Sequence, residues 1–501
     1  MRYTYLTLLI ILTLTGQLLN AQQIEIDRVA QMPDLPSTYT MRDWKDVARK
    51  YDSLVFDISQ EGEHLPIVTL GSEGINYPEI QPIFMDSYVG SSSHGQQQEA
   101  INIIPAIVGA TLVGADKTSQ FNIDWVTKVR DFYNLKNEEL VYLNGPSDNS
   151  GHDWWYETMP NVFFYQLYDL YPTTDGFESQ FISVADRWLS AVQAMGANDA
   201  PWTQPEMNYR AWSLTDMQPL DEGVREPEAA GAIAWILYQA YQHTSDEKYL
   251  VGAQWALDFL NSETENPSYE LQLPYGVLTA AKLNAEIGAN YDLEKLLNWC
   301  FDRGDLRGWG SVVGTWGGED VSGLIGEAND QGNDYVFLMN GFQQAASLAP
   351  LVKYDKRYAK SVAKWILNVA NASRLFYSNY LPENQQSDYA WIQANDPHSV
   401  IAYEAIKETW EGTELYARGD SKGAGWAETN LGLYGSSHVG YLGALIDETN
   451  VEGILQIDVN ITDFYSANEF PTYLYFNPYD QEKAITLEVG TGSHDLYDAI
   501  S

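Results

Sequence analysis

Apolar residues recur at spacings of three and four through most of the chain after about residue 95, in segments separated by turn residues. This period is typical of amphipathic helices. Ser245, followed by the acidic Asp246 and Glu247, and Asp292 suit helix N-caps, Pro274 suits a first turn, and Gly288 suits a helix end. The pattern predicts helices over residues 95–112, 119–134, 158–171, 179–195, 227–243, 246–261, 274–288, 292–302, 335–349, 356–372 and 437–447.

The joins between these helices alternate in length. The short joins are 172–178, 244–245, 289–291 and 350–355, and the long joins are 135–157, 196–226, 262–273, 303–334 and 373–436. Alternate joins between successive antiparallel helices lie at opposite ends, so all the long joins should meet at one rim. We therefore expect a mainly α fold, an (α/α)6 toroid of helical hairpins. A coiled solenoid would show the same alternation, but the sequence has no repeat of fixed period.

The toroid is expected to span residues 94–450. Residues 22–93 contain five prolines and are predicted to be irregular. Beyond residue 451, apolar and polar residues alternate in three short runs, near 454–461, 473–476 and 485–489. These runs predict three strands, which would form a small β appendage over 451–501.

The first residues have the organisation of a signal peptide. Arg2 precedes an apolar stretch from Leu6 to Leu19, and Ala21 offers a cleavage point. We expect residues 1–21 to direct export, to the periplasm or outside the cell. The single cysteine, Cys300, lies in an apolar run and is expected to be a buried thiol, so no internal disulfide can form.

Charge narrows the range of partners. The formal net charge is −41, which argues against nucleic acid and anionic membranes. No later segment is long and apolar enough to insert into a membrane. A short anionic ligand stays possible, because local arginines and lysines matter more than the global field once salt screens it. The 16 Trp and 34 Tyr would fill helical cores and could also stack on sugar rings.

The long loops hold the residues that could carry chemistry. They combine aromatic side chains, carboxylates, Tyr, His and Arg, the set that a carbohydrate site needs for stacking, for hydroxyl recognition and for bidentate binding of a carboxylate. The candidate catalytic residues are His152, Tyr156, Tyr209, Arg210 and His398. The candidate substrate-binding residues are Trp155, Glu222, Arg225, Glu226, Trp309, Trp316, Asn333, Asp334 and Tyr335.

Each candidate also has a structural explanation. Glu319-Asp320 can be a solvated turn, Trp154-Trp155 can be core, and His398 after Pro397 can be a turn residue. Residues 330–334 loosely resemble a calcium loop but lack the full ligand pattern. No metal is therefore assigned. No phosphate loop, dinucleotide motif or nucleophile elbow is present, and no cofactor is expected.

The segment from His152-Asp153-Trp154-Trp155-Tyr156-Glu157 through Gly440 resembles the (α/α)6 carbohydrate-active enzymes of marine Bacteroidetes polysaccharide-utilisation systems. That fold is shared by unsaturated glucuronyl hydrolases, other glycosidases and toroidal lyases. The closest overall resemblance is to an oligosaccharide dehydratase of ulvan breakdown. It implies an acidic oligosaccharide substrate and a 4,5-unsaturated uronate product.

Three functions are compatible with these residues. The first is elimination, in which Arg210 or Arg225 would hold the uronate carboxylate, His152 or His398 would act as base, and a tyrosine (Tyr156, Tyr209 or Tyr335) as acid or base. The second is glycoside hydrolysis by two carboxyl groups. Its candidates are Glu157, Glu222, Glu226, Glu319 and Asp320. The third is a non-catalytic glycan-binding protein.

Overall fold

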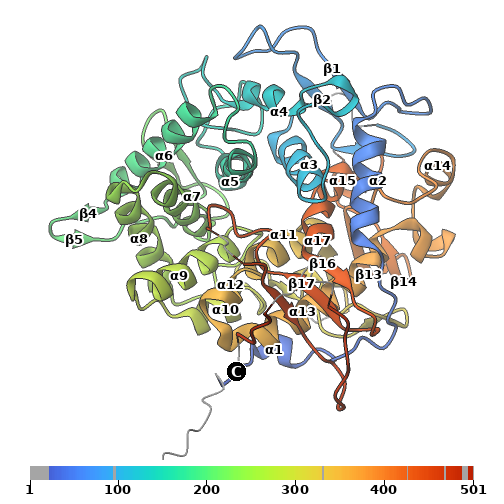
Figure 1. Ribbon diagram of the computed structural model, residues 1–501. Helices are drawn as coiled ribbons and strands as arrows, with labels where there is room; N and C mark the ends of the chain where they lie inside the picture. Colours follow the sequence, from blue (N-terminus) through green and yellow to red (C-terminus); the bar gives the residue numbers. More distant parts are fainter. Residues whose placement is uncertain are drawn as a thin grey trace, which may run out of the picture.

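The helices that follow the long joins pack side by side in a closed ring. In the computed structural model each of these inner helices contacts the next, and the last contacts the first (Figure 1). The predicted mainly α toroid is therefore confirmed. The inner helices are α3 (Ala100–Leu112), α5 (Trp154–Leu170), α7 (Ala229–Thr244), α9 (Leu273–Ile287), α11 (Leu338–Leu348) and α17 (Val439–Leu445).

A second layer of helices covers the ring from outside. The structure describes residues 22–93, 97–329, 332–425, 427–467, 470–487 and 495–499, so the predicted signal peptide lies outside it. Within these residues, the outer helices are α2 (Trp44–Phe56), α6 (Phe177–Ala194), α8 (Glu247–Ser262), α10 (Leu293–Trp299) and α13 (Ala359–Ala372). Smaller helices are α1 (Asp27–Ala30), α12 (Leu351–Tyr354), α14 (Tyr389–Asn395), α15 (Ser421–Ala424) and α16 (Leu433–Ser436).

Two predicted segments differ from the structure. Residues 22–93, predicted to be irregular, contain α2, because none of the five prolines falls in it and Asp43 caps it by accepting a hydrogen bond from the Asp46 N–H at 2.9 Å. This helix packs on α17 and α3, so the toroid begins before residue 94. The helix predicted over 119–134 is broken into short turns around α4 (Trp125–Lys128), since Asp124 starts a new cap there.

Two inner helices meet where neither has a side chain. A Cβ atom on Gly440 of α17 would lie 2.3 Å from the carbonyl carbon of Gly109 in α3. The two backbones are thus in direct contact at the point where the ring closes. Gly276 of α9 approaches Gly231 of α7 in the same way, with 2.6 Å between its Cβ position and the Gly231 Cα.

Gly440→Ala should therefore destabilise the ring. The added methyl would force α17 away from α3, and overpacking of this kind costs about 1–3 kcal/mol. Chemical denaturation measures the change. Gly435→Ala is the control, because the nearest atom to a Cβ there, on Leu338, is 3.8 Å away. Equal stability of the two variants would contradict a tight contact at the closure.

Strands occur in the loops, where the sequence predicted none. The largest sheet has five strands in the order β14-β13-β12-β11-β8 and joins two long loops. Its strands are β8 (Trp309–Ser311), β11 (Ile325–Glu327), β12 (Tyr335–Phe337), β13 (Ala405–Trp410) and β14 (Thr413–Ala417). Two-stranded ladders pair β1 (Val68–Leu70) with β2 (Ile83–Met85), β3 (Tyr88–Val89) with β15 (Leu431–Gly432), β4 (Asn198–Asp199) with β5 (Trp202–Thr203), β6 (Ala211–Ser213) with β7 (Gln218–Leu220), and β9 (Thr315–Trp316) with β10 (Glu319–Asp320).

The C-terminal appendage is a three-stranded sheet, with one strand different from the prediction. Its order is β16 (Ile446–Glu448), β17 (Leu455–Asp458) and β18 (Tyr473–Tyr475). The first strand continues directly from α17. Residues 485–487 are not a strand, and residues 488 and 489 lie outside the described part.

Residues 462–466, which follow β17, lie across the C-terminal ends of the inner helices and close that end of the ring. Thr462 donates a hydrogen bond to the Ala346 carbonyl of α11, and the Tyr465 hydroxyl donates one to the Tyr165 carbonyl of α5. Asp463 forms ion pairs with Lys282 of α9 at 2.7 Å and with Lys353 of α12 at 2.6 Å. This closing segment therefore binds helices from different parts of the ring.

Asp463→Asn should destabilise the protein strongly. Removing one partner from a buried ion pair costs about 3–5 kcal/mol, because it leaves uncompensated charge behind. Asp447→Asn, which breaks an exposed ion pair with Lys45, should cost about 1 kcal/mol or less. Thermal unfolding of both variants measures the difference, and similar losses would argue against the closing segment as an anchor.

The core contains the cysteine and many of the aromatic residues. Cys300 is buried, as predicted. The largest fully buried side chains include six tryptophans, which are Trp44, Trp125, Trp154, Trp188, Trp235 and Trp365. Among the helices in the described residues, none combines the length and apolar character required to cross a bilayer.

Candidate active site

The first turns of the inner helices face one rim, where the long loops meet. Thr158 in α5 donates a hydrogen bond to the Gln272 side chain before α9, at 2.6 Å. Asn340 in α11 donates one to the Glu270 carbonyl at 3.0 Å. Ser437, before α17, donates one to Asn102 of α3 at 2.7 Å. Side chains near helix starts far apart in the sequence therefore lie together.

Three carboxyl groups and one arginine gather at this rim. Arg210 donates hydrogen bonds to both Asp153 and Glu226, through different guanidinium nitrogens. Asp153 is the N-cap of α5, and Glu226 lies just before α7. Glu270 precedes α9, and its charge acts on Glu226. We call Asp153, Glu226 and Glu270 the carboxyl cluster.

The carboxyl cluster holds protons more tightly than ordinary carboxylates. Burial raises the pKa of Glu226 well above its usual range, and the neighbouring charge of Glu270 raises it further. Burial also raises the pKa of Glu270, with the charge of Asp153 adding to it. Within the described residues, Glu226 Oε2 and Glu270 Oε2 are buried without a hydrogen-bond partner. The two carboxyl groups therefore resist ionising together, so at least one of them stays protonated near neutral pH.

A buried carboxylate in α5 fixes the loop that carries Asp153. Glu157 Oε1 accepts hydrogen bonds from the N–H groups of Gly151 and His152, both at 2.7 Å, and of Asp153 at 3.0 Å. Its other oxygen accepts one from the Trp212 N–H at 3.2 Å. Burial raises the pKa of Glu157 to about 7, although these N–H groups oppose the shift. Glu157 thus binds two of the long loops to one helix.

Glu228 does the same for the loop that carries Glu270. It is fully buried at the N-cap of α7 and accepts hydrogen bonds from the N–H groups of Glu270 at 2.8 Å and Leu273 at 3.3 Å. Asn340 holds the Glu270 carbonyl from α11. The backbone on both sides of the Glu270 side chain is therefore fixed, which preorganises its carboxyl group.

Next to the carboxyl cluster lies a wall of cations and aromatic rings. The Arg307 guanidinium lies 5.0 Å from the ring centre of Tyr269 and 5.1 Å from that of Trp309. It donates hydrogen bonds to Glu327 at 2.7 Å and to the Tyr335 hydroxyl at 3.1 Å. Both Glu226 and Glu270 act on Tyr269, so the wall and the cluster are continuous.

The five-stranded sheet supplies the remaining side of the rim. The Tyr335 hydroxyl donates to Asp420 at 3.1 Å, and Lys407 lies 4.0 Å from the centre of its ring. Glu404 is buried, accepts a hydrogen bond from the Tyr88 hydroxyl at 2.8 Å, and has its pKa raised to about 7 by burial.

Tyr156 connects the sheet side of the rim with the carboxyl cluster. Burial raises the pKa of its hydroxyl, and the charges of Glu99, Glu270, Asp153 and Glu404 add to the shift. The side chain still exposes 42% of its surface. Tyr156 is thus the exposed aromatic residue among these carboxyl groups.

Several predicted site residues meet at the rim. Glu226 belongs to the carboxyl cluster, and Arg210 is the arginine bound to it. Trp309 and Tyr335 belong to the wall, and Tyr156 lies between the wall and the cluster. Tyr209 is half-buried beside Trp212, with its carbonyl accepting the Glu226 N–H. His152 contributes its backbone N–H to Glu157, while its side chain is exposed.

Other predicted residues lie outside the cluster. His398 lines a separate cavity of about 240 Å³ with Arg42 and Tyr380, because its loop is tied to the start of α2. Trp316 is buried in the β9–β10 hairpin, whose turn lies against β14. Glu222 and Arg225 are exposed.

The remaining predicted binding residues are structural or exposed. Trp155 is buried in α5. Asn333 is exposed, and Asp334 is buried and accepts a hydrogen bond from the Asn329 N–H at 3.0 Å. Of the carboxylates considered for hydrolysis, Glu319 is bound by Arg374 and Asp320 accepts the Ser37 N–H at 3.2 Å, both away from the cluster.

Sequence reasoning did not select Asp153, Glu270, Arg307 or Glu404. Asp153 and Glu270 share one signal, since each is acidic and stands at the end of a long join, just before an inner helix. Arg307 and Glu404 have no such signal, because the sheet that places them joins two distant loops. In the described part of the chain, no group of three or more His, Cys, Asp or Glu has a metal-binding arrangement.

Comparisons with known proteins show a weak likeness. No protein-family model matches the sequence, and no curated protein matches it. The chain is similar to the crystal structure of an unsaturated glucuronyl hydrolase from Streptococcus agalactiae in a single-site mutant form, with 10% identity and a TM-score of 0.42. The same enzyme without the mutation gives 11% identity and a TM-score of 0.35. Both alignments cover 84% of this chain and 96% of the other. Such scores assign no activity to this chain.

Glu228→Gln should loosen the loop that carries Glu270. The amide loses the charge that strengthens its hydrogen bonds to backbone N–H groups, and such charge-assisted bonds are about twice as strong as neutral ones. Hydrogen exchange at residues 270–273 should become faster, with little change elsewhere. Glu286→Gln is the control, because Glu286 accepts its hydrogen bond near the other end of α9. Unchanged exchange at 270–273 would refute this positioning role.

Proposed function

We propose that this chain is a glycoside hydrolase whose acid and base come from the carboxyl cluster. The observation that carries the proposal is the pair of buried, unpartnered oxygens, Glu226 Oε2 and Glu270 Oε2, beside the Asp153–Arg210 ion pair. Two carboxyl groups that share one proton supply the two roles required for hydrolysis.

In this reaction one carboxyl group of the Glu226–Glu270 pair is protonated and donates its proton to the glycosidic oxygen, whose bond to the sugar breaks. The other is ionised and either attacks the sugar carbon or takes a proton from the water that does so. Arg210 keeps Asp153 and Glu226 oriented, and Glu157 and Glu228 keep the loops in place.

Elimination has less support from the same residues. A tyrosine base needs a lowered pKa, whereas burial raises the pKa of Tyr156, Tyr209 and Tyr335. His398 lines a different cavity. Arg210, expected to hold a uronate carboxylate, is instead bound to two carboxylates of the protein.

The proposed substrate is an oligosaccharide with uronic acid residues, such as those from ulvan. Arg307 and Lys407 support this choice, because each pairs with one carboxylate of the protein, Glu327 or Asp420, where Arg210 pairs with two, and each is held over an aromatic ring next to the carboxyl cluster. Either could meet a sugar carboxylate while the ring stacks nearby. Export through residues 1–21 is part of the proposal and would place the enzyme where such oligosaccharides occur.

The test is a product assay on uronate-containing and neutral oligosaccharides. Hydrolysis should release new reducing ends without an ultraviolet absorbance from an unsaturated uronate. Appearance of that absorbance, or loss of one water without chain shortening, would show elimination instead. If no product forms and the glycan only binds, the protein is a binding protein and the proposal fails.

Glu226→Gln should lower kcat by about 10²–10⁴-fold, the usual contribution of a general acid or base. Glu222→Gln changes the same residue type in the same loop, but its side chain is exposed, so activity should stay within about twofold of wild type. Steady-state rates on the best substrate from the panel measure both. Comparable losses in the two variants would count against Glu226 as a reacting group.

A further inference from the structure

An exposed tryptophan stands on a hairpin that projects from the outer layer. Trp202 lies in β5, paired with β4 through Asp199, and exposes 47% of its surface. Figure 1 shows this hairpin extending beyond α6 and α8, away from the centre of the ring. A large aromatic side chain in such a position is available to a ligand.

The ring of Trp202 is fixed rather than free to turn. Its indole N–H donates a hydrogen bond to Asp258 of α8 at 2.7 Å. The ring also packs on Trp255 of the same helix, with 5.7 Å between ring centres. A ligand that stacks on Trp202 would therefore meet an ordered surface and pay little entropy for arranging it.

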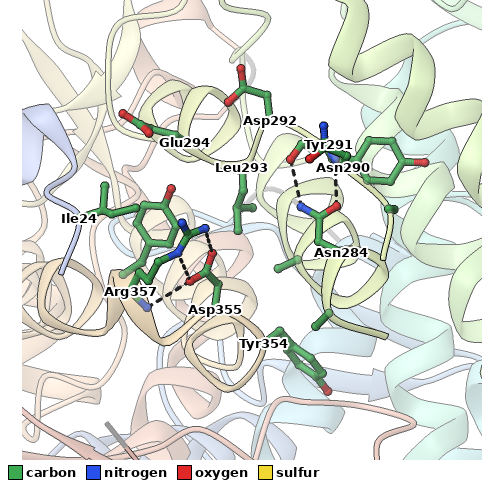
Figure 2. A pocket seen from close by; sticks show the side chains of 14 residues that line it. Ile24, Asn284, Asn290, Tyr291, Asp292, Leu293, Glu294, Tyr354, Asp355 and Arg357 are labelled. Carbon is green, nitrogen blue, oxygen red and sulfur yellow. Dashed lines mark hydrogen bonds and ion pairs between the residues drawn. The ribbon is translucent and has the colours of Figure 1, made fainter. Parts of the chain in front are cut away.

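Asp258 connects this tryptophan to a cavity at the end of α9. The Asp258 carboxylate also accepts a hydrogen bond from the Tyr291 hydroxyl. Tyr291 lines a cavity of about 650 Å³ between the end of α9, the start of α10 and the residues after α12. Figure 2 shows the side-chain amide of Asn284 bound to the backbone of Tyr291. The amide donates a hydrogen bond to the Tyr291 carbonyl at 3.0 Å and accepts one from the Tyr291 N–H at 2.9 Å.

The cavity lining is polar and acidic. Arg357 is the one arginine or lysine in it, and Asp355 engages that arginine through two hydrogen bonds, at 2.9 and 2.6 Å (Figure 2). Asp292 and Glu294 add negative charge. Such a lining repels anionic groups but offers oxygen acceptors and amides to hydroxyl groups.

We propose that Trp202 and this cavity form a second saccharide site, which binds uncharged, hydroxyl-rich sugar residues without reacting with them. The tryptophan face would stack on a sugar ring, and Asn290, Asp292 and Glu294 would bind hydroxyl groups of neighbouring residues. The site shares no residue with the carboxyl cluster, so it does not depend on the proposed hydrolysis. Its role would be to keep the protein on a polysaccharide chain.

Affinity electrophoresis of the full chain tests the proposal. Gels would contain a neutral β-glucan, a neutral xylan or anionic alginate. The neutral gels should retard the wild type, and Trp202→Ala should weaken the apparent affinity about tenfold, equivalent to about 1.4 kcal/mol. Trp202→Phe should restore part of it. Ala285→Trp places a bulky ring at the cavity and should weaken binding as well.

Phe470→Ala is the matched control, since Phe470 is also an exposed aromatic residue, 74% accessible, in the C-terminal region. It should migrate like the wild type, and thermal unfolding checks that every variant is folded. Retardation unaffected by Trp202→Ala, no retardation on either neutral glycan, or stronger retardation on alginate would overturn the proposal. Hydrolytic activity is measured separately, so its absence would bear only on the proposed function.

Discussion

Direct backbone contact between α3 and α17 is the constraint on which the arrangement depends. Gly109 and Gly440 belong to the first and last inner helices, more than three hundred residues apart, and their contact turns a row of hairpins into a ring. Because the helices after the long joins then start at the same rim, the loops before them must converge. The carboxyl cluster is a consequence of this closure, since its three residues come from three different loops.

Like charges in one place cost free energy, and the structure offsets that cost locally. Arg210 neutralises part of the cluster, and proton uptake by the carboxyl groups relieves the rest. Glu157 and Glu228 contribute differently. They are not partnered by cations but by backbone N–H groups of the loops. Buried and partly buried acids therefore serve two purposes here, one set holding backbone and the other available for chemistry.

The sequence predicted the ring because helical periodicity and join length are local properties. It identified Arg210, Glu226 and Tyr335 because they stand in long polar loops. It did not identify Glu270, because the role of this residue depends on the approach of α7 and α9. It also missed α2, because the prolines on either side of this helix indicated irregular structure. The five-stranded sheet escaped prediction because β11 and β12 are three residues each, and β12 pairs with β13, about seventy residues away. His398 had suitable chemistry, but no local signal revealed that its loop is tied to α2.

The closing segment at residues 462–466 determines at which end of the ring a ligand can enter and leave. It joins α5, α9 and α11 at the end opposite to the carboxyl cluster, with the Asp463 ion pairs among its bonds. A ligand that reached Glu226 could not thread onward through the ring and exit behind it. Substrate would enter and product would leave at the same rim, so each product would have to dissociate before the next substrate could bind.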